Sequence, residues 1–211
     1  MPSELLPLNV YYNTSTHFLW IGDRTRQLNG VHEPIWIKVG PSMAADELVR
    51  LLDTGKVMLI TCYGAAKIES HLAGHINSVQ LCGHPVAWIC DPMLGNTLTS
   101  SSGLKTCNFG TINSELTTCM RIHAECNSHM NGVSFEFTGE LSEDGFSVTE
   151  CLGGSMELTR CIVSFCDSRL NFEQSLDVAF LISNHYNRRR VRRKRADSDV
   201  LYAELSGRKF S

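Results

Sequence analysis

The apolar residues of this 211-residue chain are gathered in short runs, and the length of these runs limits what the chain can fold into. Phe18–Ile21 and the segment from Lys56 to Cys62 are typical examples. No run approaches the roughly 18 uninterrupted apolar residues that suggest a membrane-spanning helix. Short runs bounded by Gly, Asn, Ser and Thr are typical of strands and helices that pack around one core. We therefore expect an α+β fold in which short mixed strands form a compact core.

Local patterns predict the individual elements. A strand over 35–39 should be followed by a helix that begins after Ser42 and ends at Gly55, because Leu48, Leu51 and Leu52 have helical spacing. The Ser-, Thr- and Asn-rich segment 94–110 reads as a long loop. Further strands are predicted at 56–62, 79–82, 86–90, 133–138, 146–152 and 158–165.

The C-terminal part of the chain predicts a long amphipathic helix. Asn171 can cap its start, and Phe172, Leu176, Ala179 and Phe180 form an apolar stripe that leads into a run of arginines. Length favours a single main domain. We expect an N-terminal strand and turn segment over 1–33, a cysteine-rich domain over 34–187, and a basic helix and tail over 188–211.

Charge is unevenly distributed along the chain. Seven of the 19 basic residues lie between positions 188 and 195, which leaves 12 basic residues against 22 acidic ones elsewhere. Such a run can be a nuclear import signal, a contact to phosphate or RNA, or a solvated helix end, and its density favours import. The residues concerned are Arg188, Arg189, Arg190, Arg192, Arg193, Lys194 and Arg195.

Nine cysteines, an odd number, are spread through a chain whose first residues lack the basic start and apolar run of a signal peptide. We therefore expect the protein to stay inside the cell with its thiols reduced. Metal binding is then the leading use for them, and the alternative is that they are small buried apolar residues. No Cys-x2-Cys pair, which marks a zinc ribbon or finger, is present.

Signals for an enzyme are weak. His123-Ala124-Glu125 is similar to half of a zinc deaminase motif, but the Pro-Cys-x-x-Cys half is missing. His123, Cys126 and His129 could still bind a metal. No Gly-x-Ser-x-Gly turn and no phosphate-binding glycine loop occurs. We therefore predict that the protein is not an enzyme.

Several segments, taken in order, resemble the adenoviral early-region 34K protein family over about residues 35 to 195. They are the Leu run after Glu47, the segment 56–62, the Cys82-x2-Pro85-x4-Cys90 element, Gly145-Phe146-Ser147 with Cys151, and Cys161 to Cys166 before the basic helix. The resemblance implies a viral adaptor in the host nucleus. Together with a viral 55K partner, it would recruit elongin B and C and a cullin ubiquitin ligase, direct host proteins to degradation, and favour export of viral late mRNA.

The ordered spacing of the thiols gives our set of zinc ligands. We predict Cys82, Cys90, Cys151, Cys161 and Cys166, with His84 and Cys62 as further candidates. Two other classes of function stay open. One is an RNA-binding module that uses the arginine-rich helix, and the other is a zinc-dependent hydrolase or deaminase around His123 and Glu125.

Overall fold

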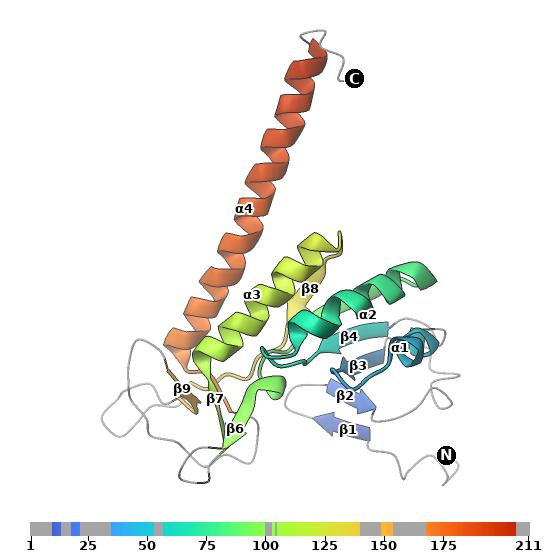
Figure 1. Cartoon of the computed structure of the whole chain (residues 1–211). Helices are drawn as coiled ribbons and strands as arrows, with labels where there is room; N and C mark the ends of the chain where they lie inside the picture. Colours follow the sequence, from blue (N-terminus) through green and yellow to red (C-terminus); the bar gives the residue numbers. More distant parts are fainter. Residues whose placement is uncertain are drawn as a thin grey trace.

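A computed structural model describes residues 10–13, 18–21, 35–52, 57–99, 103, 105–139, 149–153 and 168–205. Figure 1 shows a body of helices and strands from which one long C-terminal helix projects. The elements within the described ranges are β1 (Val10–Asn13), β2 (Phe18–Ile21), β3 (Ile35–Val39), α1 (Ala45–Leu52), β4 (Val57–Thr61), α2 (Ile68–Cys82), β5 (Val86–Cys90), the 3-10 helix η2 (Leu94–Asn96), β6 (Thr97–Thr99), β7 (Lys105–Asn108), α3 (Phe109–Glu125), β8 (Met130–Val133), β9 (Cys151–Leu152) and α4 (Phe172–Leu205).

The central sheet has four strands in the order β3-β4-β5-β8, and every neighbouring pair is parallel. Its strands follow one another in the sequence, and α1, α2 and α3 lie in the connections between them. Right-handed crossover connections between parallel strands that follow one another in this order bring their helices to the same face of the sheet. Figure 1 shows α2 and α3 side by side over the sheet, and one apolar cluster joins the three helices to its strands.

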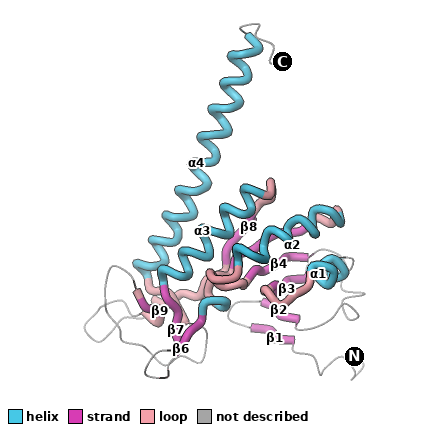
Figure 2. The backbone as a smooth tube through the Cα atoms, viewed as in Figure 1, coloured by secondary structure: helices cyan, strands magenta, loops and turns pink. Residues whose placement is uncertain are grey.

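The remaining strands form two smaller sheets. β1 and β2 pair as an antiparallel hairpin, and β6, β7 and β9 form a three-stranded sheet in which β7 pairs antiparallel to β6 and parallel to β9. Figure 2 shows β6, β7 and β9 together near the start of α4. The prediction of a fold that mixes helices with short strands is therefore confirmed, with a parallel sheet as its main feature.

The core explains why the three connecting helices form where they do. α1 buries Leu48, Leu51 and Leu52, while its acidic residues stand in the first turn, where the helix dipole favours them. Asn108 caps the start of α3, and its side chain accepts a hydrogen bond from the Thr111 N–H at 3.1 Å. The predicted strands 35–39 and 86–90 have the observed bounds, and 56–62 and the first helix differ from the structure only at their ends.

Three predicted elements are wrong. Residues 79–82 form the last turn of α2 and not a strand, because Ile68, Leu72, Ile76 and Val79 bury one helical stripe. The expected loop over 94–110 contains β6, β7 and the start of α3. The predicted strand 133–138 is displaced, since β8 ends at Val133. In the predicted strand 146–152 the structure describes residues 149–152, of which Cys151 and Leu152 form β9. The predicted strand 158–165 lies outside the described residues.

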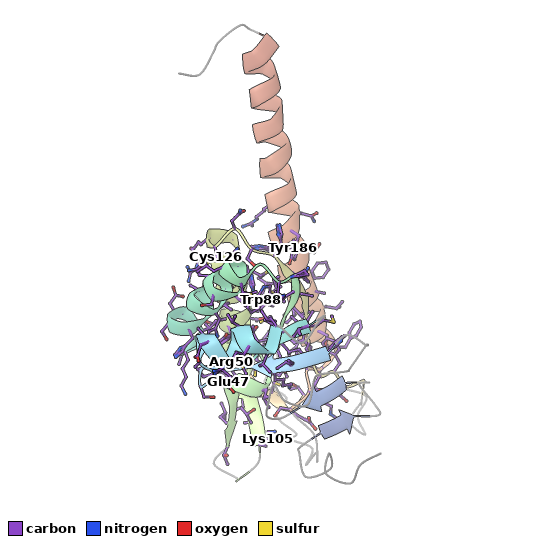
Figure 3. All side chains as sticks on the ribbon, turned by 90° about the vertical axis from the view of Figure 1, so that its right-hand side faces the viewer. Glu47, Arg50, Trp88, Lys105, Cys126 and Tyr186 are labelled. Carbon is purple, nitrogen blue, oxygen red and sulfur yellow. The ribbon has the colours of Figure 1, made fainter. Side chains whose placement is uncertain are left out.

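The long C-terminal helix is present, but the expected stripe does not form its buried side. Phe172, Leu176 and Phe180 are exposed, whereas Gln174 and Val178 face the body. The reason is that Gln174 has polar partners there, since its amide donates to the Gly153 carbonyl oxygen at 3.1 Å. Further along α4, the Tyr186 hydroxyl donates to the Met130 carbonyl oxygen at 2.6 Å, and Figure 3 shows Tyr186 where α4 leaves the body.

None of the described helices combines the length and apolar character needed to cross a bilayer.

Candidate functional site

The carboxyl ends of the parallel strands place several polar side chains at one edge of the sheet. Lys38 lies in β3, Cys62 follows β4, and Asp91 follows β5. Backbone hydrogen bonds continue the ladder past the strand ends, from Cys62 N–H to Val39 O at 2.9 Å and from Asp91 N–H to Thr61 O at 2.8 Å. In parallel α/β sheets this edge is where ligands usually bind.

An ion pair between Lys38 and Asp91 is the main charged feature of this edge. The Lys38 Nζ atom lies 2.8 Å from Asp91 Oδ2, and the two side chains are 27% and 7% exposed. Asp91 Oδ1 accepts hydrogen bonds from the N–H groups of Met93 and Leu94 at 3.1 and 3.3 Å. The carboxylate is thus fixed by the turn that follows β5, and it holds an ammonium group that is still partly open to solvent.

The loops behind this pair pack closely on each other. Gly64, with φ of 80°, follows β4, and Gly95 belongs to the turn that follows β5. A Cβ atom on Gly95 would lie 2.4 Å from the Gly64 nitrogen, so a larger residue cannot stand there without moving one loop. The structure therefore brings the loop after β4 and the turn after β5 into backbone contact.

A buried carboxylate lies under both loops. Glu115 of α3 has no exposed surface, and its Oε1 atom accepts the N–H groups of Tyr63 and Gly64, each at 3.0 Å. Its Oε2 atom accepts the Asn96 side-chain amide at 2.5 Å. Burial raises the pKa of Glu115 to about 7, and the three hydrogen bonds offset only part of that effect.

Tyr63 is fixed on its other side by a histidine. The Tyr63 hydroxyl lies 2.5 Å from His75 Nδ1, and His75 Nε2 lies 3.0 Å from the Met43 carbonyl oxygen. Since a carbonyl can only accept, Nε2 carries the proton and Nδ1 accepts from the hydroxyl. Burial lowers the pKa of His75, which favours this neutral form. The loop after β4 is thus connected to the segment before α1.

Two buried thiols lie between the sheet and α3. Cys90 and Cys119 are hydrogen-bonded to each other, and His123 and Thr61 also bond to Cys119. The mutual hydrogen bond raises the pKa of Cys90 and lowers that of Cys119, so Cys119 ionises first. His123 is itself buried, with Nδ1 at 3.0 Å from the Ser128 hydroxyl and its ring edge-on to Trp88. Because none of these groups reaches the surface, they act as part of the core.

The predicted metal ligands do not gather at this edge. Cys82 ends α2 and His84 precedes β5, whereas Cys62 and Cys90 lie at the carboxyl ends of β4 and β5. A strand of five residues spans roughly 17 Å, which separates the two sets. Cys151 lies in the smaller sheet, and its thiol faces the Arg169 carbonyl oxygen at 3.7 Å.

In the described part of the chain, no group of three or more His, Cys, Asp and Glu side chains is arranged to hold a metal ion. Burial raises the pKa of Cys62 to about 12, which keeps this thiol protonated in the structure as described. Cys161 and Cys166 lie outside the described residues. The assignment of the seven ligands therefore stays a prediction.

Sequence reasoning missed the three side chains that organise this edge, namely Lys38, Asp91 and Glu115. Lys38 and Asp91 could have been found from the predicted strands. Lys38 lies in the strand 35–39, and Asp91 directly follows the strand 86–90. Glu115 gave no such signal, because the helix that carries it was not predicted.

Comparison with known proteins identifies the family. Residues 6–183 match the model of the class-II DAHP synthetase family. The chain is 45% identical over 206 residues to the phospho-2-dehydro-3-deoxyheptonate aldolase of Neurospora crassa, a match that covers 87% of this chain and 42% of the relative. It is 40% identical over 202 residues to the enzyme of that name from Mycolicibacterium smegmatis, which covers 86% of this chain and 42% of the relative. The chain thus spans less than half the length of these relatives.

These matches overturn the viral resemblance and what it implied. The matched relatives are a fungal and a bacterial enzyme, so the predictions of a viral adaptor, of 55K, elongin and cullin partners, of mRNA export and of a host nucleus are wrong. The prediction of a non-enzymatic protein is also wrong, because the matching family is one of enzymes. Neither the RNA-binding module nor the zinc hydrolase or deaminase is supported. By the extent of the model match and the identity to these relatives, the chain belongs to the class-II DAHP synthetase family.

Proposed function

We propose that this chain forms part of the active centre of an aldolase that acts on a phosphorylated seven-carbon 2-oxo-3-deoxy sugar acid. Support comes from the two relatives, both named phospho-2-dehydro-3-deoxyheptonate aldolase. The whole activity is proposed and not established for this chain, which spans 42% of either relative. The Lys38–Asp91 pair at the carboxyl edge of the sheet is the observation that carries the assignment to this site.

The chemistry of such a compound explains why a cation is needed at this edge. A carbonyl at C2 makes the bond between C3 and C4 the one that an aldolase forms or breaks. Carboxylate and phosphate groups on either side of that bond must be held in place while it reacts. Lys38 offers a positive charge, and Asp91 restricts where that charge can lie. We therefore propose that Lys38 contacts an anionic group of the substrate.

A metal cofactor is compatible with the family, whose members are metal-dependent enzymes. Asp91 is the carboxylate that pairs with Lys38 at this edge, and both of its oxygens already accept hydrogen bonds. The described residues therefore do not form a complete metal site. The predicted choice of zinc stays a proposal, as does a phosphate contact by the basic residues of α4, from Arg188 to Arg195.

Calorimetric titration of the chain with phospho-2-dehydro-3-deoxyheptonate tests the proposal. We expect measurable binding to the unmodified chain and at least tenfold weaker binding to the Lys38→Met variant, since loss of a charge-assisted contact has about that effect. The Arg50→Met variant is the matched control. It also removes one positive charge, but from an exposed ion pair with Asp46 on α1. Absence of binding, or equal weakening in both variants, would refute the proposal.

A further inference from the structure

Glu115 makes contacts that packing alone does not require. It is a fully buried carboxylate in the middle of α3, between the apolar residues Ile112 and Cys119. Burying a charge is costly unless polar partners compensate, and a leucine would fill the same space without that cost. The partners of Glu115 all belong to the two loops at the carboxyl edge, so the carboxylate links α3 to that edge.

The links form a small closed network. Glu115 Oε1 holds the N–H groups of Tyr63 and Gly64 in the loop after β4, and Oε2 holds the Asn96 amide in the turn after β5. Asn96 then joins the two loops directly, because its Oδ1 atom accepts the Ala65 N–H at 2.9 Å. Its amide also donates to the Pro92 carbonyl oxygen at 2.8 Å, next to Asp91.

From this network we infer that Glu115 is a positioning residue for the candidate site. It fixes the loop after β4 against the turn after β5 and so determines where Asp91 holds the Lys38 ammonium group. The path is short, since Asn96 bonds to Pro92, Pro92 follows Asp91, and Asp91 pairs with Lys38. The part of this inference that concerns substrate rests on the proposed function, whereas the part that concerns Lys38 does not.

The groups that face Glu115 define its electrostatic surroundings. Tyr63 and Cys62 face it from the loop after β4, Cys90 from the end of β5, and Cys119 from the next turn of α3. None of these is a cation, and burial is the largest cause of the raised pKa of Glu115. Neutral donors alone therefore hold this carboxylate, so the geometry of those donors determines how well it is accommodated.

The exchange of one donor for one acceptor gives a sharp test. In Glu115→Gln, the new amide N–H2 group must face either the two backbone N–H groups or the Asn96 amide, and both are donors. In Asn96→Asp, two carboxylates face each other. The double variant Glu115→Gln with Asn96→Asp restores a donor opposite an acceptor at the contact between positions 115 and 96 only. Gln can accept both backbone N–H groups and donate to Asp, but the bond from Asn96 to the Pro92 carbonyl oxygen is lost. The control is Glu150→Gln, which alters another buried carboxylate, one paired with Arg169.

Two readouts that need no ligand follow each variant. The first is hydrogen exchange at the Tyr63, Gly64 and Ala65 amides, which should be at least tenfold faster in both single variants and partly restored in the double variant. The second is the rate at which an acylating reagent modifies the Lys38 amine, with Lys105 as internal reference. We expect a several-fold faster reaction of Lys38 in both single variants and in the double variant, which still lacks the bond to the Pro92 carbonyl oxygen, and no change in the control.

Unchanged exchange at these amides in Glu115→Gln would overturn the inference. Faster exchange with an unchanged Lys38 reaction rate would also overturn it, since Glu115 would then support the loop without positioning the site. Failure of the double variant to slow exchange at these amides would show that the pairing of Glu115 with Asn96 is not the cause. Because neither readout uses a ligand, failure of the chain to bind the sugar acid would count against the proposed function alone.

Discussion

The raised pKa of Glu115 predicts a specific dependence of stability on pH. Burial raises this pKa from its ordinary value of 4.5 to about 7, so the folded protein binds the proton more tightly than the unfolded chain does. The stability that this proton contributes is fully present below pH 4.5 and is lost as the pH rises to about 7. At about 1.4 kcal/mol for each tenfold change in proton affinity, the loss is about 3 kcal/mol.

Glu115→Gln isolates this contribution, because glutamine carries no titratable proton. Urea unfolding of both proteins at pH 5, 6, 7 and 8 gives their unfolding free energies. Subtracting one series from the other removes groups common to both, such as His75, whose lowered pKa acts in the opposite sense as the pH falls below its ordinary value of 6.5. The variant loses stability through its misplaced amide at every pH. The informative quantity is therefore how the difference in unfolding free energy between the two proteins changes with pH.

We expect the wild-type protein to lose about 3 kcal/mol relative to the variant between pH 4.5 and pH 8, with little change above pH 8. Most of that change falls within the four pH values, since titration of the folded state centres near pH 7. Parallel series would refute the reasoning, because they would mean that Glu115 has the same proton affinity in the folded and unfolded protein. A difference that changes in the opposite sense would mean that its three hydrogen bonds outweigh burial.

Three further substitutions test the packing around the site. Glu150→Ala leaves the Arg169 guanidinium without the carboxylate that now holds it at 3.0 Å. Urea unfolding should show a loss of about 3 kcal/mol in the free energy of unfolding, and a loss below about 1 kcal/mol would contradict this reasoning. Tyr63→Phe removes the hydroxyl that bonds to His75 Nδ1 and should cost about 1 to 3 kcal/mol in the same assay; a neutral effect would mean that this hydrogen bond is absent in solution. Leu72→Ala opens a cavity under α2, which should cost about 3 kcal/mol of unfolding free energy and lower the thermal midpoint by several degrees. An unchanged midpoint would place Leu72 outside the core.

The elements that sequence reasoning found are those whose pattern is visible in a single stretch of chain. β3 and β5 are apolar runs of strand length, and α1 combines helical spacing with acidic residues in its first turn. α3 was missed because Thr111, Asn113, Ser114 and Thr117 have weak helix propensity and are common in loops. Burial of Ile112, Leu116, Cys119 and Met120 against the sheet outweighs that propensity, and such tertiary packing cannot be read from local pattern.

The viral resemblance was wrong because each of its motifs is an ordinary piece of an α/β unit. In the Cys82-x2-Pro85-x4-Cys90 element, Cys82 ends α2, Pro85 stands just before β5, and Cys90 is the last residue of β5. A helix end, a turn with Gly83 at φ of 75° and a short strand account for the spacing without any shared ligand. Ordered pieces of this kind recur in unrelated proteins, so their order adds little specificity.

Cysteine number misled the search for a site because it measures composition, whereas function depends on where a side chain lies. Cys90, Cys107 and Cys151 are all buried, and their partners are carbonyl oxygens or another thiol of the core. In such surroundings a reduced thiol behaves as a small apolar residue. The ion pair of Lys38 with Asp91, by contrast, is a charged contact at a strand edge that packing does not need. A charged residue at the carboxyl end of a predicted parallel strand is therefore a better indicator of a site than a count of cysteines.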